Sequence, residues 1–531
     1  MPTTKQKLLI LGLDALPWRI VKPMMDAGAM PRLKALVDSG SSGALRSTIP
    51  HQTPSAWTTF MTGVQPGTHG IVNWQHYNAA SNTLALNDIQ RFAGKSIYER
   101  MSEAGFRVGV VMQPLTFPPF KVNGFLLSGF DTPSINEPFA QPRELEKEVL
   151  EICPRHAENL GLEEQWEGGN QEAGDAPFLA NVTLLNERVN RVTALALELY
   201  KRYPTDVLMV YFQDTDLMLH CAWRWCDPAT WNEHPGRRAA SIEFFKTLDR
   251  ACGELIDAVG SLENNGTTLV LSDHGQRPDA VRVRMNSILI ELGFLVPATG
   301  FAKVKESVRR VQSKLQKTNE TGYGVPIDWA RTRAFMPFQS CTGFIYLNLE
   351  GRQPRGSVKS SEFIRVRDEL IEALRGYRDP KTGQNYFGDI APMDEAHGWR
   401  KDLLLPDVYV QPVEGVEFVR KAKPGEIVYP TKRPYAGLHD PDGLYILHGN
   451  NVRTATELNA HIVDMAPTLL AALNQPIPSY MEGRVLNECF MTPITVESVP
   501  FAWEEQAPGD AYSAEGAAAV EKRLADLGYL D

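Results

Sequence analysis

The chain has 531 residues, enough for two or three average domains or for one α/β core elaborated by an insertion. Its hydrophobic content of 43% and charged content of 22% are those of an ordinary globular protein, which argues against extended disorder. The net charge of −10 argues against tight binding to a nucleic-acid polymer, because phosphate backbones are bound by clusters of Lys and Arg.

The N-terminal sequence and the cysteines predict a cytoplasmic protein without a membrane span. The opening MPTTKQKLLILGLDALPW is basic, but Asp14 interrupts its apolar run and no small-residue cleavage site follows, so we expect no signal peptide. No stretch approaches the roughly 18 apolar residues that span a bilayer. The six cysteines include no CxxC pair, which is typical of reduced thiols in the cytoplasm.

The order of the predicted elements indicates an α/β protein. Five short apolar runs predict buried strands of a parallel sheet, at residues 7–13, 107–112, 206–212, 267–272 and 444–449. Patterns with helical periodicity occupy residues 30–40, 188–203 and 239–259. Because strands and helices alternate, we expect a sheet that is covered by helices on both faces.

The sequence between the predicted strands and the C-terminus suggests a domain plan. We expect a catalytic domain over residues 1–490, interrupted at about 283–435 by an insertion rich in Pro and Gly turns that caps the site. Residues 491–531 are expected to form a tail with one amphipathic helix. Ser513 is the predicted N-cap of that helix, and Gly528 is expected to end it.

Acidic residues directly follow three of the predicted strands. Asp14 follows the first, Asp214 and Asp216 follow the third, and Asp273 follows the fourth. In open parallel sheets, ligands collect outside the carboxyl ends of strands, so these acids could converge in one crevice. Each acid alone is as well explained by a turn or a helix cap, and the hypothesis of a site depends on all of them together.

Histidines accompany two of these acids at spacings suited to a metal. Asp216 and His220 are four residues apart and would share one face of a helix, although such a pair is also common as a surface contact. Asp273 and His274 are adjacent at a strand end, and Gly275 permits the sharp turn that would follow.

A third histidine, His439, lies in a turn-rich loop before the last strand and taken alone would be read as a loop residue. The set of candidate ligands comprises Asp14, Asp216, Asp273, His220, His274 and His439. Three carboxylates and three imidazoles suit two Zn²⁺ ions or similar divalent cations. About +4 from two ions against −3 from the carboxylates leaves roughly +1, which would stabilise one alkoxide.

The segment 52–70 offers six hydroxyls, on Thr53, Ser55, Thr58, Thr59, Thr62 and Thr68. Thr53 precedes Pro54, which favours the first position of a helix, so Thr53 is the predicted N-cap and Gly63 the predicted end. Its oxygen would then lie at the positive end of the helix dipole, where a nucleophile and a phosphate oxygen are both stabilised. Ser55 is the competing nucleophile, and a simple cap is the alternative role of Thr53.

Five motifs together resemble a known family: LLILGLDALPW, TPSAWTTFMTGVQPGTHGI, TDLMLHCAW, SDHG and GLHDPDGLYILHG. They are similar to those of the alkaline phosphatase superfamily, in its type I phosphodiesterase and nucleotide pyrophosphatase branch, and specifically to cytoplasmic bacterial and archaeal members. Further stretches of similarity extend over nearly the whole chain, for example IVDMAPTLLAALNQPIPSYMEGRVL. The resemblance implies a three-layer α/β/α sandwich with a mostly parallel central sheet and an inserted cap region.

The resemblance also implies a phosphodiesterase that uses two divalent metal ions, Zn²⁺ or alternatively Mn²⁺, to cleave a small phosphate ester through a phosphorylated Thr53. The nucleophile-side metal would be held by Asp14, Thr53, Asp273 and His274, and the leaving-group-side metal by Asp216, His220 and His439. A phosphomonoesterase, a phosphonate hydrolase or a phosphotransferase would use the same residues, and a non-catalytic binding protein is the alternative of another class.

One position departs from the family pattern. Nucleotide pyrophosphatases carry an Asn about twenty-one residues after the nucleophile, where it contacts a phosphate oxygen. Here Asn73 follows Thr53 by twenty residues, and Trp74 follows it by twenty-one. Asn73 is therefore the candidate for this substrate contact. A sulfatase is disfavoured, because Thr53 cannot form the formylglycine that those enzymes use.

Overall fold

The structure is a computed structural model that describes residues 6–91, 94–161, 174–260, 266–278, 281–299, 322–393, 404–430, 436–495, 497–500, 511–527 and 529–530. The chain divides into two compact units. The first combines Met1–Gln65, Asp88–Pro278 and Tyr435–Arg523, and the second combines Pro66–Asn87, Asp279–Pro434 and Leu524–Asp531.

The first unit is built on a ten-stranded sheet with a parallel centre. Its parallel strands are β9 (Gly266–Leu271), β1 (Lys7–Leu13), β8 (Val207–Phe212), β5 (Val108–Val111) and β6 (Gly124–Leu127), in this spatial order. All residues of β5, β8 and β9 are buried, which explains their continuous apolar sequences. The strands predicted at residues 7–13, 107–112, 206–212 and 267–272 are therefore confirmed as β1, β5, β8 and β9.

The fifth predicted strand exists but runs the other way. β19 (Asp442–Gly449) pairs antiparallel with β9 on one side and with β2 (Ser41–Arg46) on the other. The prediction of a parallel strand at residues 444–449 was therefore wrong. An apolar run signals burial on both faces but carries no information about strand direction, and here β19 follows directly on β18 (Gly437–Asp440) without a crossover helix.

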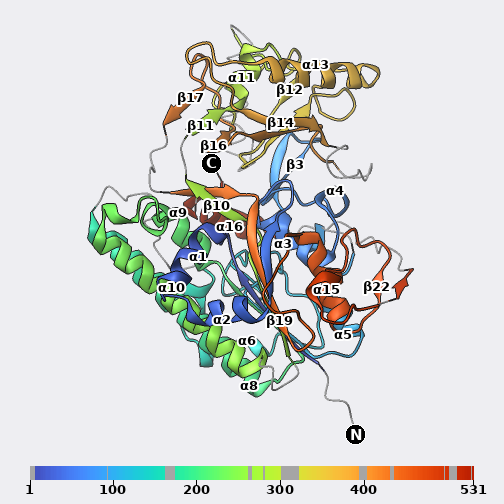
Figure 1. Ribbon diagram of the computed structural model, residues 1–531. Coiled ribbons are helices and arrows are strands. Elements are labelled where there is room, and N and C mark those ends of the chain that lie inside the picture. Colours follow the sequence, from blue (N-terminus) through green and yellow to red (C-terminus); the bar gives the residue numbers. More distant parts are fainter. Residues whose placement is uncertain are drawn as a thin grey trace. The chain divides into compact units, whose positions relative to one another are not determined.

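Helices cover both faces of this sheet (Figure 1). One face carries α1 (Trp18–Asp26), α2 (Pro31–Ser39), α8 (Asp175–Arg202), α9 (Asp214–Cys226) and α10 (Pro235–Leu255), and the other carries α3 (Thr53–Thr62), α5 (Ile97–Glu103) and α15 (Met465–Ala472). The predicted three-layer α/β/α class is thereby confirmed. The helices predicted at 30–40, 188–203 and 239–259 correspond to α2, α8 and α10, with α8 beginning well before its predicted start.

The described residues of the second unit form two small sheets and a separate hairpin. Four antiparallel strands form one sheet, in the order β12 (Ala334–Phe335), β13 (Gly343–Leu347), β15 (Val408–Pro412) and β14 (Phe387–Pro392). The other sheet has the order β16 (Val416–Val419), β11 (Val281–Arg284) and β17 (Val428–Pro430). Helices α11 (Met285–Glu291) and α13 (Phe363–Gly376) and the hairpin β3 (Gln75–Asn78) and β4 (Thr83–Leu86) complete this unit. Its expected role as a cap stays a prediction.

The C-terminal helix α16 (Ala514–Leu527) begins as predicted. The Oγ of Ser513 accepts a hydrogen bond from the backbone N–H of Gly516 at 3.0 Å, which confirms Ser513 as the N-cap. Gly528, the predicted end of the helix, lies outside the described residues. As far as Arg523 the helix belongs to the first unit, where Arg523 Nη1 donates to the carbonyl of Thr132 at 2.9 Å.

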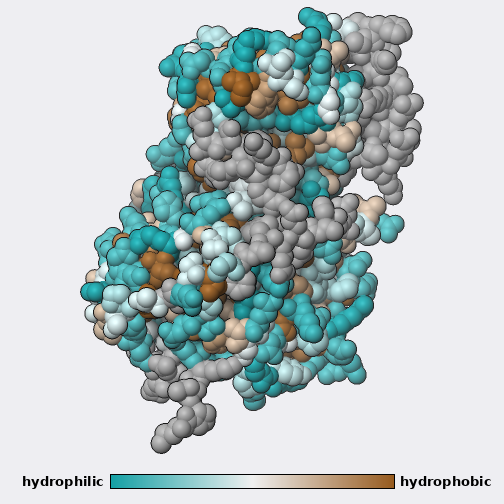
Figure 2. Space-filling view, turned by 90° about the vertical axis from the view of Figure 1, so that its right-hand side faces the viewer, coloured by the Kyte–Doolittle hydropathy of each residue, from teal (hydrophilic) through white to brown (hydrophobic). Residues whose placement is uncertain are grey.

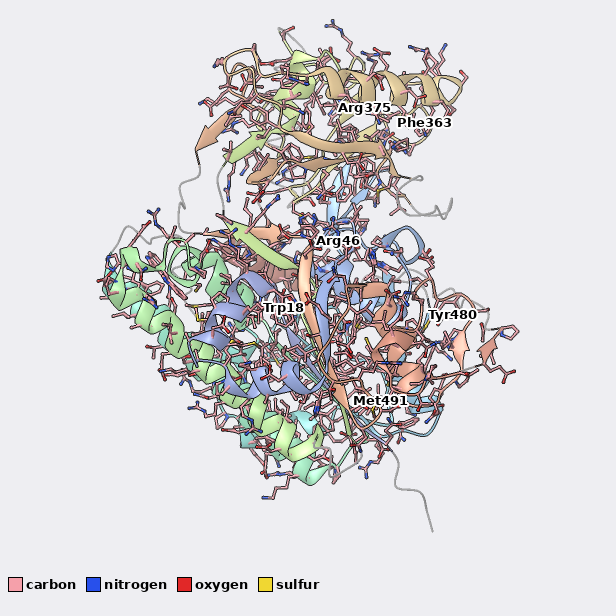
Figure 3. All side chains as sticks on the ribbon, viewed as in Figure 1. Trp18, Arg46, Phe363, Arg375, Tyr480 and Met491 are labelled. Carbon is pink, nitrogen blue, oxygen red and sulfur yellow. The ribbon has the colours of Figure 1, made fainter. Side chains whose placement is uncertain are left out.

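Hydrophobic and hydrophilic side chains are mixed on the visible face of the described residues (Figure 2). Figure 2 shows one face, on which hydrophilic residues predominate and hydrophobic ones form small separate groups. None of the described helices is long and apolar enough to cross a bilayer. Two side chains labelled in Figure 3 form contacts with the sheet. Trp18 Nε1 of α1 donates to the carbonyl of Gly43 in β2 at 2.8 Å, and Arg46 of β2 forms an ion pair with Asp442 of β19 at 2.9 Å.

Helix α3 is seated on the sheet at Gly12. A β-carbon on Gly12 would lie only 2.7 Å from Cη2 of Trp57 and 2.9 Å from Cε of Met209. Trp57 is fully buried, and its ring stands edge-on to Tyr211 with 5.3 Å between centroids. The glycine therefore lets the indole reach the backbone of β1, and this contact sets the distance between α3 and the end of β1.

We predict that Gly12→Ala lowers the free energy of unfolding by about 1–3 kcal/mol, because the added methyl overpacks the contact with Trp57. Urea denaturation measures the change. Gly236→Ala is the matched control: nothing lies within 4 Å of its β-carbon in the first turn of α10, so its stability should stay within about 1 kcal/mol of wild type. Equal stabilities of Gly12→Ala and the control would contradict this account.

His156, in helix α7 (His156–Asn159), makes stability depend on pH. Its side chain is fully buried with its ring 5.0 Å from that of Phe139, and burial lowers its pKa to about 4. The unfolded chain binds a proton near pH 6.5, whereas the folded chain does so only near pH 4. Stability is therefore complete above pH 6.5 and is lost as the pH falls toward 4.

We predict that the stability of wild type relative to His156→Leu falls by about 3 kcal/mol between pH 7 and pH 4, as a pKa difference of about 2.5 requires. The comparison uses urea denaturation of both proteins at each pH, so that the titration of other groups cancels. A pH-independent difference between the two proteins would show that His156 does not carry this linkage.

Candidate active site

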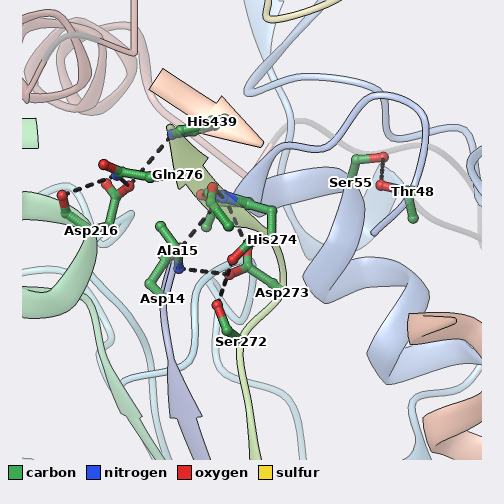
Figure 4. Close-up of polar contacts among 12 residues, drawn as sticks. Asp14, Ala15, Thr48, Ser55, Asp216, Ser272, Asp273, His274, Gln276 and His439 are labelled. Carbon is green, nitrogen blue, oxygen red and sulfur yellow. Dashed lines mark hydrogen bonds and ion pairs between the residues drawn. The ribbon is translucent and has the colours of Figure 1, made fainter. Parts of the chain in front are cut away.

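The carboxyl ends of three adjacent strands supply most of the candidate residues. Strand β1 lies between β8 and β9, and Asp14 follows its last residue. Asp273 and His274 follow β9, and helix α9 begins directly after β8, so that Asp216 stands in its first turn. The register of the parallel sheet thus ends these three strands side by side. Figure 4 shows the side chains meeting above the strands.

The first group consists of Asp14, Asp273 and His274, whose ligand atoms all lie within 4.8 Å of one another. His274 Nε2 is 3.6 Å from Asp14 Oδ1 and 3.3 Å from Asp273 Oδ2. The hydroxyl of Thr53 lies 3.3 Å from the same nitrogen. All four side chains are fully buried. Two carboxylates, an imidazole and a hydroxyl therefore converge on one point.

The second group consists of Asp216, His220 and His439. Asp216 Oδ1 is 3.2 Å from Nε2 of His220 and 3.5 Å from Nε2 of His439, and these two nitrogens are 3.1 Å apart. The rings of His439 and His274 are stacked with 4.0 Å between centroids, so the two groups are neighbours. All six candidate ligands and Thr53 belong to the first unit.

The carboxylates of the first group are free on the side where a cation would bind. Within the described part of the chain, Asp14 Oδ1 and Asp273 Oδ2 have no hydrogen-bond donor, although both are buried. The opposite oxygens are occupied: Tyr211 donates to Asp14 Oδ2, and the backbone N–H of Ala15 donates to Asp273 Oδ1 at 3.2 Å. Carboxylates oriented in this way fit a divalent metal ion.

Backbone carbonyls orient two of the histidines, His220 and His274. Nδ1 of His220 lies 2.9 Å from the carbonyl of Gly437, and Nδ1 of His274 lies 3.1 Å from the carbonyl of Gly275. Because a carbonyl only accepts, both Nδ1 atoms carry the proton, and the lone pair of each ring is on Nε2. Those are the nitrogens that face the carboxylates, as metal ligation requires.

Burial and neighbouring charges shift the pKa values in the two groups. Burial, together with the charges of Asp273 and Asp216, raises the pKa of Asp14 well above its usual value. Burial likewise raises the pKa of Asp273 to about 7 and lowers that of His274 well below its usual range. For Asp216 burial acts in the same direction, but the hydrogen bonds and positive charge that His220 and His439 supply when protonated hold its pKa well below normal. Divalent cations would offset the cost of burying these carboxylates.

Helix α3 begins at Thr53, one position earlier than predicted. The helix runs Thr53–Thr62 with Gln52 as its N-cap, so the prediction of Thr53 as the N-cap was wrong, because the chain is already helical one residue before Pro54. Gly63 ends the helix with φ +73° as expected. Thr53 remains in the first turn, where the helix dipole is positive.

The other hydroxyls of the segment are engaged in the helix or its flank. Thr58 and Thr62 donate to carbonyls four residues back, at 2.7 Å each. Ser55 accepts from the hydroxyl of Thr48 at 3.2 Å, so the competing nucleophile faces away from the ligand groups (Figure 4). Asp214 pairs with Arg188 at 3.4 Å and takes no part in either group.

Asn73, the predicted substrate contact, belongs to the second unit. Its Nδ2 donates to the carbonyl of Gln339 at 2.9 Å, and its Oδ1 accepts from the backbone N–H of Gln75 at 3.4 Å. Both ends of the amide thus hold the local backbone. A contact with substrate stays a prediction.

Sequence reasoning missed two residues that form hydrogen bonds with the candidate ligands, Tyr211 and Gln276. Tyr211 is paired with Gly12 across the two parallel strands and bonds to Asp14. Gln276 follows His274 by two residues, in the strand that begins at Gly275, and its Nε2 donates to Asp216 Oδ1 at 2.7 Å. The second residue could have been found from the two-residue repeat of a strand, but the first needs the register of the sheet.

The fold and the site define an α/β protein with two candidate metal-binding groups beside a buried hydroxyl. A family model for type I phosphodiesterase / nucleotide pyrophosphatase matches residues 8–442, so the chain belongs to this family. Membership supports a hydrolase of phosphate esters. Among curated proteins, none matches the chain in sequence.

Solved structures show the same fold at low identity. An inactive variant of murine ectonucleotide pyrophosphatase/phosphodiesterase 5 in complex with AMP is 14% identical with a TM-score of 0.51, over 89% of this chain and 96% of that chain. The human protein of the same name is also 14% identical with a TM-score of 0.51, over 92% of this chain and 99% of that chain. Phosphonoacetate hydrolase from Sinorhizobium meliloti 1021 in complex with phosphonoformate is 16% identical with a TM-score of 0.50, over 89% of this chain and 96% of that chain.

We predict that His439→Ala and Asp14→Asn each lower the metal content from about two ions per chain to about one, because each variant removes one ligand of a separate group. Elemental analysis by mass spectrometry after gel filtration measures the content. Asp257→Asn is the control, since Asp257 forms an exposed ion pair with Arg32 and belongs to neither ligand group, so that the metal content should stay unchanged. Two variants that retain every ion would rule out these ligand groups.

Proposed function

We propose that the chain is a two-metal phosphohydrolase of the phosphodiesterase and nucleotide pyrophosphatase type, which cleaves a small phosphate ester through a phosphorylated Thr53. The observation that carries this proposal is the position of Thr53 Oγ1, 3.3 Å from His274 Nε2. The buried hydroxyl thus stands among the ligand side chains of the first group rather than in contact with solvent.

The two ligand groups suit divalent ions of the Zn²⁺ or Mn²⁺ class. One ion would be held by Asp14, Thr53, Asp273 and His274, and the other by Asp216, His220 and His439. When bound, such a pair of ions supplies positive charge to the attacking and the leaving oxygen of a phosphoryl displacement. Three imidazoles among these seven ligands favour borderline cations over Mg²⁺.

The chain itself supplies the nucleophile and its surroundings. Thr53 Oγ, having lost its proton, attacks phosphorus, so that a new Oγ–P bond forms and the ester P–O bond breaks. The leaving oxygen departs as an alcohol after taking a proton from solvent. Water then attacks the phosphorus of this threonine-linked ester, which breaks the Oγ–P bond, releases the phosphate monoester of the remaining group and restores the hydroxyl. Backbone N–H groups in the first turn of α3 favour the negative oxygens of the substrate throughout.

We predict that Thr53→Ala lowers kcat on bis-nitrophenyl phosphate by at least about a thousandfold, whereas Thr53→Ser retains measurable activity. Acid quenching of wild type during turnover of this diester, followed by peptide mass spectrometry, should find a nitrophenylphosphoryl group on Thr53. A Thr53→Ala protein that keeps its metal ions and full diesterase activity would show that Thr53 is not the nucleophile.

A substrate panel sets the class of ester. Diesters, dinucleotides, monoesters and phosphonates are compared by kcat/KM at equal metal loading, and we expect diesters or dinucleotides to be preferred. A clear preference for monoesters or phosphonates would replace the diesterase with a phosphomonoesterase or phosphonate hydrolase that uses the same residues.

A further inference from the structure

Gln276 lies beside the second ligand group without belonging to it. It is the second residue of β10 (Gly275–Pro278), which pairs antiparallel with β18, and it stands directly opposite His439 in that pairing. Residues opposite each other in an antiparallel pair share one face, so Gln276 and His439 project to the same side. Only 2% of Gln276 is exposed. Figure 4 shows its amide reaching Asp216.

The hydrogen bond from Gln276 is made to Oδ1 of Asp216, the oxygen that faces the two histidines of the second group. Gln276 Nε2 donates to Asp216 Oδ1 at 2.7 Å and lies 3.3 Å from the carbonyl oxygen of the same residue. Asp216 Oδ1 is also the oxygen that lies nearest the Nε2 atoms of His220 and His439. A carboxylate only accepts, so the amide nitrogen must be the group that faces it. The side chain of Gln276 therefore holds the ligating oxygen itself.

Packing alone does not account for an amide at this position. Gln276 Oε1 is buried and has no hydrogen-bond partner among the described residues, which makes an amide less favourable here than an apolar side chain of equal length. The charge-assisted hydrogen bond to Asp216 is the compensation visible in the structure. The first ligand group has its own equivalent, because Tyr211 donates to Asp14.

We propose that Gln276 is a positioning residue that fixes Asp216 for the metal ion of the second group, an inference that rests on the proposed two-metal function. Without its hydrogen bond, the carboxylate of Asp216 is free to rotate away from His220 and His439. Loss of such a partner typically weakens metal binding by about 10- to 100-fold. The first group keeps all of its contacts and should bind its ion unchanged.

The test is a metal titration of Gln276→Met, which keeps the length of the side chain and removes the donor. Metal-free protein is titrated with Zn²⁺ against a chelator, and with Co²⁺ monitored by visible absorption. We expect the dissociation constant of one ion to rise about 10- to 100-fold and that of the other to stay within about twofold. The Co²⁺ spectrum of the weakened site should change, and excess Zn²⁺ should restore phosphoesterase activity.

Gln113→Met is the matched control, because Gln113 is a fully buried glutamine of the same unit that accepts from Tyr98 and belongs to neither ligand group. It should alter neither metal affinity. If Gln276→Met fails to fold, Gln276→Leu serves with the same readings. Unchanged affinity for both ions in a folded variant overturns the role of Gln276 while the proposed function stands. A wild-type protein that binds no metal overturns both.

Discussion

The constraint on which the rest of this structure depends is the burial of three carboxylates at neighbouring strand ends. Asp14, Asp216 and Asp273 are fully buried, and the described residues near them supply imidazoles and a phenol but no close Lys or Arg partner for the first group. Burial of uncompensated carboxylates is costly, and the raised pKa values of Asp14 and Asp273 express that cost. Two divalent cations would remove it and at the same time equip the site for phosphoryl transfer.

Several features of the fold serve this arrangement. The order β9, β1, β8 places three carboxyl ends next to one another, and the antiparallel β18 brings His439 to the same place from a distant part of the sequence. Gly12 allows Trp57 to seat α3 on β1, which sets Thr53 beside His274. The hydroxyl of Tyr211 donates a hydrogen bond to Asp14 and thereby orients its carboxylate. Stability of the sheet and geometry of the site are thus linked through shared residues.

Much of the fold could be predicted from the sequence, because buried parallel strands are continuous apolar runs and their lengths are short. The direction of β19 could not be predicted, since its apolar pattern is the same in either direction. The first residue of α3 was misplaced by one, because Thr followed by Pro is compatible with both the N-cap and the first helical position.

The candidate ligands could be named from their positions after strands and from the family motifs, but the contacts that orient them could not. Tyr211 reaches Asp14 only through the register of β1 against β8, and the partners of Asn73 depend on the folding of the second unit. The cytoplasmic location, the cap and the preference for diesters stay predictions.

The most direct test of the central claim is a crystal structure of the metal-loaded protein with anomalous data at the absorption edge of the bound metal. The account predicts two anomalous peaks about 3.5–4 Å apart, one beside Asp14, Asp273, His274 and Thr53, the other beside Asp216, His220 and His439. Fully ordered ligand side chains without a peak at either group, or with metal bound elsewhere, would contradict it.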